Sequence, residues 1–534
     1  MKVLLLSNIN MQPLVQFLNP WDVTVGEFNS LILDLSNPSS LAQSPEYSHI
    51  LCLYDTDSLL GEALYGEGTP EQCEFYLEAL ELFCLAQAGK VVITNTFCVS
   101  SARWLNFADL THEASLRSLE NHLNERLLQL TKKHSNLIVI DIELLFRLYG
   151  EQALLSNAFW YMGRIRYSNQ MLRVLANRVQ QAVRAYSSQC RKVLILDLDN
   201  TLWGGIVGEV GPLGIDLSND GKGWCFRDFQ RVLRALRKTG VLLAIASKNN
   251  AADIDEVFQK NPMMVLQRED FACIRANWEP KPCNILEIAA TLNLGVNSLV
   301  FIDDNPAERE LVVTSLPEVA VPEFPARVEE LSPWFLREVA PTYFGKTRIT
   351  SEDVRKTEQY RANEERRQLS VSLDLDAFLE NLRIECKLQV DPGDQVARIA
   401  QLTQKTNQFN LTTRRYQIPE IEFFLNSPAH AVVLLEYSDR FGFEGAVGLV
   451  ILNYKECRID SLLMSCRVIG RHVEDRLLDK ACELLRSRGC GRIVGEFIST
   501  PKNQQVASFY DSHGFVVLAE YEGRRLYEKV MNGR

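Results

Sequence analysis

Four apolar residues, Val193 to Leu196, run directly into the acidic sequence Asp197-Leu198-Asp199. A short apolar run without alternation is typical of a strand that is buried on both faces of a parallel sheet. Such sheets bind ligands at the carboxyl ends of their strands, where these carboxylates would lie. Two carboxylates this close tolerate each other best around a cation, and Mg²⁺ prefers oxygen ligands. The stretch therefore predicts an α/β domain with a metal site, and a strand followed by an ordinary polar turn is the alternative.

Two later apolar runs also end in polar residues. One run ends in Ser247 and the other ends in Asp303 and Asp304, and between them Lys281 lies in a proline-flanked loop. This set suits phosphoryl transfer, in which a carboxylate attacks, a hydroxyl and an ammonium hold the phosphoryl oxygens, and a metal neutralises charge. The combination favours phosphoryl transfer over a plain turn.

The order Asp-x-Asp-x-Thr, Ser, Lys, Asp-Asp resembles the haloacid dehalogenase (HAD) superfamily of aspartyl-phosphate phosphatases. The resemblance implies that Asp197 is the nucleophile and that Asp199 is the general acid and base. The residues that it assigns to phosphate binding are Ser247 and Lys281, with Asn200 and Thr201 beside them. The residues that it assigns to Mg²⁺ are Asp197, Asp199 through its backbone carbonyl, Asp304, and Asp303 alongside. The glycine-rich segment 202–209 follows where that superfamily carries a flap over the site.

Composition limits the classes of protein to consider. The 534 residues suffice for three or four domains, and a net charge of −11 argues against general nucleic-acid binding. Thirteen cysteines, an odd number without a Cys-x-x-Cys pair, predict reduced thiols rather than disulfides or a zinc site. The opening apolar run is too short for a signal peptide, and no run is long enough to span a membrane. We therefore expect a cytoplasmic protein with neither membrane nor nucleic-acid partners.

Residues 1–185 carry short apolar runs separated by helix-length segments, an alternation that predicts a parallel-sheet α/β domain. Two of the runs end in polar pairs, Ser7-Asn8 and Thr94-Asn95, that could line a cleft. The arrangement is similar to the SGNH hydrolase fold, but the Gly-Asp-Ser start and the Asp-x-x-His pair of that fold are missing. We therefore expect a scaffold or docking domain.

The rest of the chain divides into three parts. Residues 190–345 hold the phosphatase motifs and form the HAD-like, Rossmann-like domain. Residues 346–369 are densely charged and predict an exposed connecting helix. Residues 370–534 carry alternating strands and form the last domain. The predicted fold class is thus multidomain α/β, with an α+β domain at the carboxyl end.

Residues 370–534 resemble the GNAT acyltransferase fold. A late Asn-x-x-Val-x-x-Phe-Tyr pattern beginning at Asn503 matches that fold, and Arg467 and Gly470 match its loop for the pyrophosphate of coenzyme A. His472, however, occupies the place of a small residue and would crowd a pyrophosphate. The resemblance therefore implies a groove for a phosphopantetheine arm rather than ordinary coenzyme A binding.

An amide-rich stretch, residues 402–416, precedes these motifs. Asn407, Gln408 and Asn410, together with Arg467 and Asn503, are candidates for binding a substrate or the pantetheine arm. A plain surface loop has the same composition.

Cys466 is the candidate nucleophile of this domain. It stands at a predicted strand end before a helix N-terminus, with Arg467 and Arg471 nearby, and such surroundings favour a thiolate. His472 is the candidate base. The other cysteines are better interpreted as small buried apolar side chains.

In combination, these motifs resemble the FkbH-like family of polyketide pathways over nearly the whole chain. The resemblance implies a bifunctional glyceryl transferase and phosphatase that uses Mg²⁺. D-1,3-bisphosphoglycerate would acylate the cysteine, the phosphatase would remove the 3-phosphate, and the glyceryl unit would pass to the phosphopantetheine thiol of an acyl carrier protein. One alternative is a phosphatase fused to a coenzyme A-dependent N-acyltransferase. Another is a binding module with degenerate sites.

Overall fold

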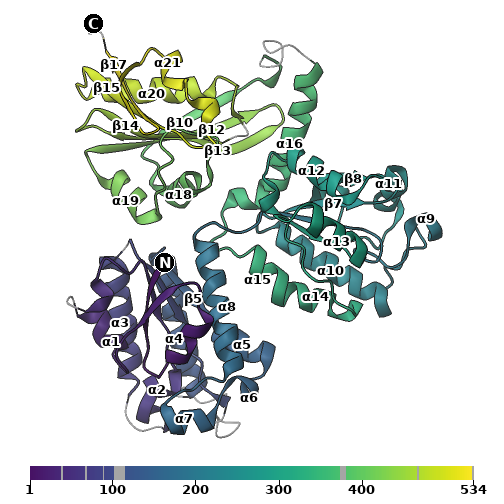
Figure 1. Cartoon of the computed structure of the whole chain (residues 1–534), viewed down its shortest axis with the longest axis vertical. Coiled ribbons are helices and arrows are strands. Elements are labelled where there is room, and N and C mark those ends of the chain that lie inside the picture. The colour runs from purple at the N-terminus through teal and green to yellow at the C-terminus, as the bar shows by residue number, and fades with distance from the viewer. Residues whose placement is uncertain are drawn as a thin grey trace. The chain divides into compact units, whose positions relative to one another are not determined.

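The computed structural model describes residues 1–37, 40–65, 69–87, 89–101, 115–372, 380–465 and 468–531. The chain divides into two compact units (Figure 1), Met1–Tyr186 with Gln417–Glu420, and Ser187–Tyr416 with Ile421–Arg534. The first unit holds one sheet, and the second holds two. The predicted multidomain α/β fold class is confirmed. No helix among the described residues combines the length and the apolar character that crossing a membrane requires.

The sheet of the first unit has five parallel strands in the order β2-β1-β3-β4-β5. These strands are β1 (Lys2–Leu6), β2 (Asp22–Val25), β3 (His49–Cys52), β4 (Val91–Asn95) and β5 (Leu137–Ile140). Separate apolar clusters cover the two faces. One cluster includes α3 (Glu71–Ala86) and α4 (Leu116–Lys133), and the other includes α5 (Ile142–Tyr149) and α8 (Asn169–Tyr186). The predicted parallel-sheet domain is therefore present, and its likeness to the SGNH fold stays a prediction.

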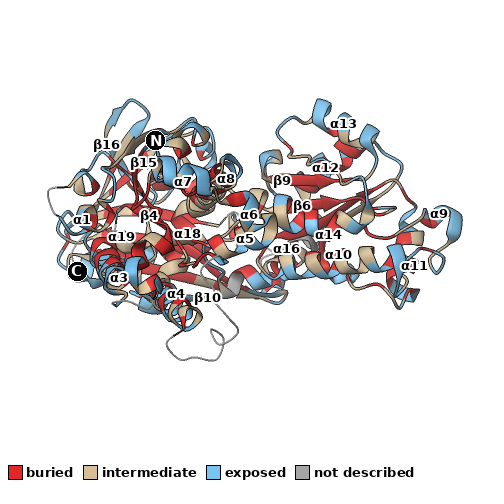
Figure 2. Cartoon of the chain, turned by 90° about the horizontal axis from the view of Figure 1, so that it is seen from below, coloured by how far each residue is buried: buried red, intermediate tan, exposed pale blue. Residues whose placement is uncertain are grey.

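A four-stranded parallel sheet carries the phosphatase motifs, in the order β8-β7-β6-β9. The strands are β6 (Val193–Leu196), β7 (Leu242–Ser247), β8 (Phe271–Ala276) and β9 (Leu299–Ile302). Strand β6 is central and wholly buried (Figure 2), which explains its apolar run without alternation. We call the part from β6 to α15 (Ala340–Tyr343) the middle domain.

Helices cover both faces of this sheet. The helices α10 (Gly221–Arg237) and α11 (Ala251–Lys260) share one apolar cluster, and α12 (Lys281–Thr291) and α13 (Pro306–Ser315) share the other. Pro306 opens α13 as predicted, because a first-turn residue needs no N–H for the helix. The carboxyl ends of β6, β7 and β9 are thereby fixed next to one another.

The C-terminal domain, from β10 (Glu385–Val390) to β17 (Arg524–Val530), is built on an eight-stranded sheet in the order β10-β12-β13-β14-β15-β17-β16, with β11 against β14. Its other strands are β11 (Phe409–Asn410), β12 (His430–Asp439), β13 (Gly442–Asn453), β14 (Arg458–Met464), β15 (Arg492–Ile498) and β16 (Val516–Tyr521). Figure 1 shows α20 (Val473–Ser487) on one face of this sheet, and α18 (Val396–Lys405) and α19 (Ile418–Asn426) on the other.

Strands β14 and β15 run parallel but pair at a single position, Arg458 with Val494. Strand β11 pairs with the far end of β14. Leu411, which follows β11, donates its N–H to Leu462 of β14 and accepts the N–H of Ile498 of β15, at 3.0 and 2.8 Å. The chain itself therefore bridges the gap between the two strands.

The predicted linker is α16 (Ser351–Ser372), and the structure corrects its predicted exposure. Thr357 and Arg366 are buried on this helix. Arg366 donates to both carboxylate oxygens of Asp439, each at 2.7 Å, and to Glu444. The charge run misled the prediction because Arg366 faces buried partners on the C-terminal sheet rather than water.

The cysteine prediction also needs a correction. Cys457 and Cys490 form a disulfide that joins the starts of β14 and β15. The other described cysteines are free thiols, as predicted.

Candidate active site

Asp197 follows β6 directly and lies at the centre of the candidate site. Its Oδ1 accepts hydrogen bonds from Ser247 Oγ, at 2.9 Å, and from Lys281 Nζ. Burial raises the pKa of Asp197 to about 6, with Asp303 adding to the rise and Lys281 opposing it. The structure thus brings the predicted nucleophile and both predicted phosphate ligands together on one carboxylate oxygen.

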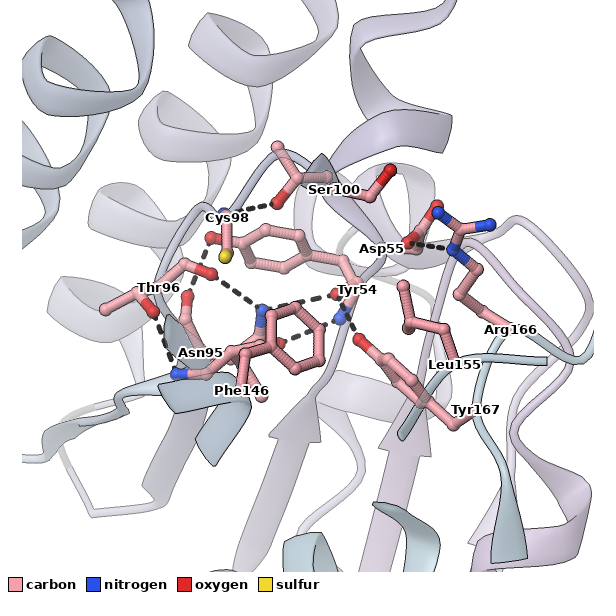
Figure 3. A pocket seen from close by; sticks show the side chains of 12 residues that line it. Tyr54, Asp55, Asn95, Thr96, Cys98, Ser100, Phe146, Leu155, Arg166 and Tyr167 are labelled. Carbon is pink, nitrogen blue, oxygen red and sulfur yellow. Dashed lines mark hydrogen bonds and ion pairs between the residues drawn. The ribbon is translucent and has the colours of Figure 1, made fainter. Parts of the chain in front are cut away.

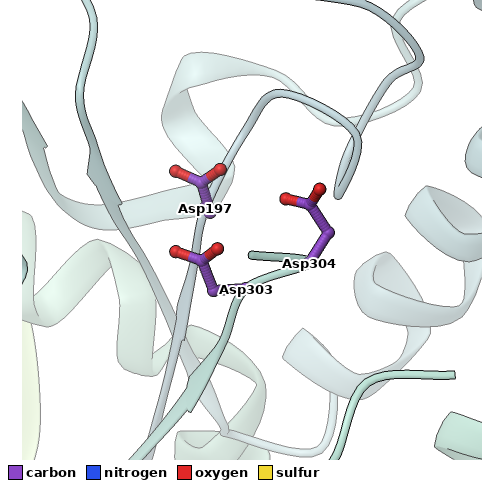
Figure 4. Close-up of side chains that lie close together, drawn as sticks. All are labelled: Asp197, Asp303 and Asp304. Carbon is purple, nitrogen blue, oxygen red and sulfur yellow. The ribbon is translucent and has the colours of Figure 1, made fainter. Parts of the chain in front are cut away.

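Asp303 and Asp304, after β9, complete a cluster of three carboxylates with Asp197 (Figure 4). One oxygen of each lies within 4.8 Å of the others. Burial raises the pKa of both Asp303 and Asp304. Three carboxylates forced this close in a buried place are the donor set that a hard divalent cation needs, so these residues fit Mg²⁺.

Lys281 is almost wholly buried and has three acceptors. Besides Asp197, its Nζ lies 2.7 Å from the Ala246 carbonyl and 3.2 Å from Asp303 Oδ2. Burial alone would lower the pKa of Lys281, but Asp197 and Asp303 raise it above its usual value. Lys281 is therefore held as a cation beside the nucleophile.

Asp199 lies apart from the three-carboxylate cluster and is oriented by the flap. Its Oδ1 accepts from the indole N–H of Trp203, at 2.8 Å, and from the Val207 N–H, at 3.1 Å. Its Oδ2 accepts from Asn249, at 3.0 Å. Asn249 also donates to Ser247 Oγ, at 3.0 Å, and so links Asp199 to Ser247.

Trp203 and Asn249 are site residues that the sequence interpretation missed. The signal for Asn249 was its position two residues after Ser247, and the signal for Trp203 was its place in the flap. Both side chains are buried and donate a hydrogen bond to the carboxylate of Asp199.

The side chains of Asn200 and Thr201 accept hydrogen bonds from backbone N–H groups. Asn200 has a left-handed φ of 54° and accepts the Gly205 N–H, at 3.0 Å. Thr201 is buried and its hydroxyl accepts the Asp304 N–H, at 3.2 Å. They shape the turn, the flap and the loop of Asp304, and their direct contact with phosphate stays a prediction.

In the C-terminal domain, the predicted nucleophile Cys466 and Arg467 lie outside the described residues. The predicted base His472 begins α20 with a left-handed φ of 57°. Its Nδ1 lies 3.1 Å from Asp475 Oδ2, and its side chain is two-thirds exposed, at 67%. The other oxygen of Asp475 lies 2.9 Å from Nε2 of His513.

The predicted substrate-binding amides take different positions. Asn410 and Asn503 are buried, and Asn503 donates to the carbonyls of Asn410 and Ile498, at 2.9 and 2.8 Å. Both side chains therefore hold the β11 segment in place, and their contact with substrate stays a prediction. Asn407 bonds Arg415, and Gln408 is half-buried. The predicted late helix is only a 3-10 turn, Gln504–Val506, and the short α21 (Phe509–Ser512).

A small polar pocket lies at the carboxyl ends of β3 and β4 in the first unit (Figure 3). It encloses about 10 Å³, the room of a single water molecule. Asn95, predicted to line a cleft there, bonds the backbone of Tyr54, at 3.0 Å, and Arg166 pairs with Asp55, at 3.4 Å, and Asp57, at 2.9 Å. Most of these polar groups pair with one another, although Arg166 Nε makes no hydrogen bond, and the scaffold role stays a prediction.

Comparisons with known proteins place these domains among solved structures. No protein-family profile and no curated protein matches the chain. The N-terminal part of the protein BF1531 from Bacteroides fragilis, described as containing a phosphatase domain and complexed with Mg, is similar at a TM-score of 0.60 and 28% identity. That similarity covers 65% of this chain and 95% of that chain.

Two acetyltransferase-type structures are also similar, at a level too low to support an argument. Ard1 from Thermoplasma volcanium has a TM-score of 0.23 and 15% identity, over 28% of this chain and 99% of its own. The GNAT domain of S. lividans PAT has a TM-score of 0.23 and 15% identity, over 27% and 90%. The chain thus contains a phosphatase-type domain of the kind found in the B. fragilis protein.

Proposed function

We propose that the chain is a two-site enzyme, with a Mg²⁺-dependent phosphatase in the middle domain and an acyl transferase in the C-terminal domain. The observation that carries the proposal is the buried clamp on Asp197, where Ser247 and Lys281 share one carboxylate oxygen beside Asp303 and Asp304. A similar structure, the B. fragilis phosphatase domain, was solved with Mg, which supports the choice of metal.

The clamp suits a two-step hydrolysis of a phosphate monoester. A carboxylate oxygen of Asp197 attacks the phosphorus, the bond to the ester oxygen breaks, and Asp199 gives its proton to the leaving alcohol. Asp199 then takes a proton from water, whose oxygen attacks the phosphorus, releases phosphate and restores Asp197. Ser247 and Lys281 hold the phosphoryl oxygens in both steps. A divalent cation held by the three carboxylates neutralises the charge of the phosphoryl group.

The resemblance to the FkbH-like family suggests the substrates. The thiolate of Cys466 attacks the acyl carbon of D-1,3-bisphosphoglycerate, and the carbon–oxygen bond to the 1-phosphate breaks to release phosphate. The middle domain removes the 3-phosphate, and the glyceryl group passes to the phosphopantetheine thiol of an acyl carrier protein. His472 takes the thiol proton on Nε2, since its Nδ1 is bonded to Asp475.

A coenzyme A-dependent N-acyltransferase is the second candidate for the C-terminal domain. The Asn-x-x-Val-x-x-Phe-Tyr pattern that begins at Asn503 and matches the GNAT fold supports this candidate. This candidate needs no cysteine, so replacing Cys466 distinguishes the two.

The phosphatase is tested by hydrolysis of D-glycerate 3-phosphate and other small phosphate monoesters with purified protein. We expect activity that requires Mg²⁺, stops with a chelator and is lost in Asp197→Asn. An Asp197→Asn protein with normal activity and a normal fold would refute the aspartyl-phosphate route.

The transferase is tested by intact-protein mass spectrometry after incubation with D-1,3-bisphosphoglycerate. We expect a glyceryl or phosphoglyceryl adduct that disappears in Cys466→Ala and persists in Cys283→Ala, which removes an exposed thiol. Absence of any adduct from intact reagent would favour direct or coenzyme A-dependent transfer.

A further inference from the structure

Two lysines bind one carboxylate near the start of α16, and a third lysine, at the end of α18, interacts with them electrostatically. Lys346 precedes α16, Asp353 and Lys356 lie in the first turns of α16, and Lys405 ends α18. The ammonium groups of Lys346 and Lys356 lie 2.8 and 2.9 Å from Asp353 Oδ1. Lys405 interacts electrostatically with Lys356, Asp353 and Lys346. The cluster therefore combines two lysines of the segment between the domains with one lysine of the C-terminal domain.

Each carboxylate oxygen of Asp353 already accepts two hydrogen bonds, so neither is left to accept one from Lys405. Its Oδ2 accepts both the N–H and the hydroxyl of Thr350, each at 3.0 Å, in a capping arrangement at the start of α16. Its Oδ1 is taken by Lys346 and Lys356. Over the described parts of the chain, Lys405 Nζ makes no hydrogen bond and no ion pair.

Burial and the neighbouring positive charges lower the pKa values of Lys405 and Lys356. Burial, and next the neighbouring Lys356, lowers the pKa of Lys405 well below its usual value. Burial and then Lys346 lower the pKa of Lys356 to about 8. Like charges held together in a partly desolvated place are unfavourable unless an anion joins them.

The cluster lies at the opposite end of β7 from the Asp197 site. Gly240, two residues before β7, lies so close to Asp353 that a Cβ there would come within 2.8 Å of the Asp353 carbonyl oxygen. Ser247, at the other end of β7, contacts Asp197. Six residues of strand separate the two places by roughly 20 Å.

We propose that Lys346, Lys356 and Lys405 form a binding site for a phosphate dianion, separate from the phosphatase centre. Three lysines around one carboxylate, with Arg398 also within electrostatic range, leave an excess of positive charge that a phosphate monoester or inorganic phosphate balances. The side chains of Lys346 and Lys356 remain 20% and 24% exposed, so solvent and a small anion reach them. Compact ammonium groups with rotatable donors suit the three acceptor oxygens of phosphate. The site does not depend on the proposed glyceryl transfer.

The test measures binding of radiolabelled inorganic phosphate to the full chain by equilibrium dialysis, in a Lys281→Met background that weakens binding at the phosphatase centre. We expect one saturable site whose affinity falls at least tenfold when Lys405→Met is added, because a charge-assisted contact is lost. The matched control Lys387→Met, a lysine that is 73% exposed on β10, should leave the affinity unchanged.

Two further measurements complete the test. Competition with D-glycerate 3-phosphate distinguishes a site for free phosphate from a site for a phosphorylated substrate, and either outcome supports the proposal. Without phosphate, Lys405→Met should melt no lower than the parent protein, because its charge is disfavoured in the fold. An unchanged phosphate affinity in Lys405→Met, or no saturable site in the Lys281→Met background, would overturn the proposal.

Discussion

Trp203 shows how a single side chain can set the geometry of a catalytic carboxylate. Its indole N–H lies 2.8 Å from Asp199 Oδ1, and its ring is buried in the middle-domain core. The left-handed conformation of Asn200 turns the chain so that the flap folds back over Asp199. Trp203 thus helps to orient Asp199, the residue that we propose as the general acid.

Replacing Trp203 by phenylalanine tests this orientation. Trp203→Phe keeps an aromatic ring but removes one hydrogen bond to a charged group, so we expect kcat to fall roughly tenfold with little change in KM. The measurement is steady-state hydrolysis of a phosphate monoester. Trp224→Phe, which changes a partly exposed tryptophan of α10, should retain full activity. A normal kcat in Trp203→Phe would show that Val207 and Asn249 alone orient Asp199.

His49 at the start of β3 makes the first unit sensitive to acid. Burial, with a smaller effect from the N-terminal ammonium, lowers the pKa of His49 to about 4, and its Nε2 is buried without a partner. The unfolded chain binds a proton at this residue below pH of about 6.5, whereas the folded chain resists it until about pH 4. The contribution of His49 to stability therefore falls as the pH drops through that window.

Hydrogen-exchange mass spectrometry of peptides across β3 measures this effect. We expect protection to decrease between pH 6.5 and 4, and His49→Asn to flatten the decrease. The exposed His122 is the matched control, and His122→Asn should keep the wild-type profile. A His49→Asn protein with an unchanged pH profile would assign the acid sensitivity to other groups.

At the scale of elements, β11 is the part of the C-terminal domain that holds two separated strands together. It pairs with β14, and the following Leu411 bonds both β14 and β15. Asn503 fastens this segment by donating to the Asn410 carbonyl, and accepts the Thr500 N–H, at 2.7 Å. A two-residue strand is stable here because buried side-chain amides supply the bonds that its length cannot.

Removing the Asn503 amide should loosen the whole segment. Asn503→Ala leaves the buried carbonyls of Asn410 and Ile498 without this donor, so we expect the free energy of unfolding to fall by about 2 kcal/mol. Urea unfolding measures the change. Asn426→Ala, at an exposed position of α19, should cost less than about 0.5 kcal/mol. A loss of substrate affinity at unchanged stability would instead support the role predicted from sequence.

These elements also show how far the sequence could lead. Strands β6, β7 and β9 were predictable because each is an apolar run with a polar residue after it, and the parallel arrangement then had to bring Asp197, Ser247 and Asp303 together. Asn410 and Asn503 were interpreted as substrate ligands because composition cannot tell an amide that faces solvent from one that faces a backbone carbonyl. The partners of Asn503 lie on two other segments, and only the fold determines their approach.

At the scale of the whole molecule, α16 anchors both domains of the second unit through charge. Near its start, Asp353 bonds Lys346 and packs against Gly240 of the middle domain. Thirteen residues later, roughly 20 Å along the helix, Arg366 reaches Asp439 and Glu444 of the C-terminal sheet. The acidic partners of Arg366 lie 73 and 78 positions away, so the local charge run gave no sign of them.

Replacing Arg366 should be costly. Arg366→Met removes a cation from the buried carboxylates of Asp439 and Glu444, although Arg471 stays 3.7 Å from Asp439, so we expect the free energy of unfolding to fall by about 3 kcal/mol. Adding Glu444→Gln should recover part of the loss. The control Arg440→Met, which replaces an exposed arginine of the neighbouring turn, should have little effect in the same urea titration. An Arg366→Met protein as stable as the parent would mean that water reaches these carboxylates.

The two anchors of α16 have a practical consequence for anyone who wishes to produce the domains separately. A fragment that ends before residue 351 deprives Lys346 of Asp353, and a fragment that begins after residue 372 deprives Asp439 and Glu444 of Arg366. If α16 is cut and divided between two fragments, Asp353 and Arg366 no longer belong to the same helix. An expressible C-terminal fragment must therefore carry α16 complete, and an expressible middle domain must carry its own copy of the same helix.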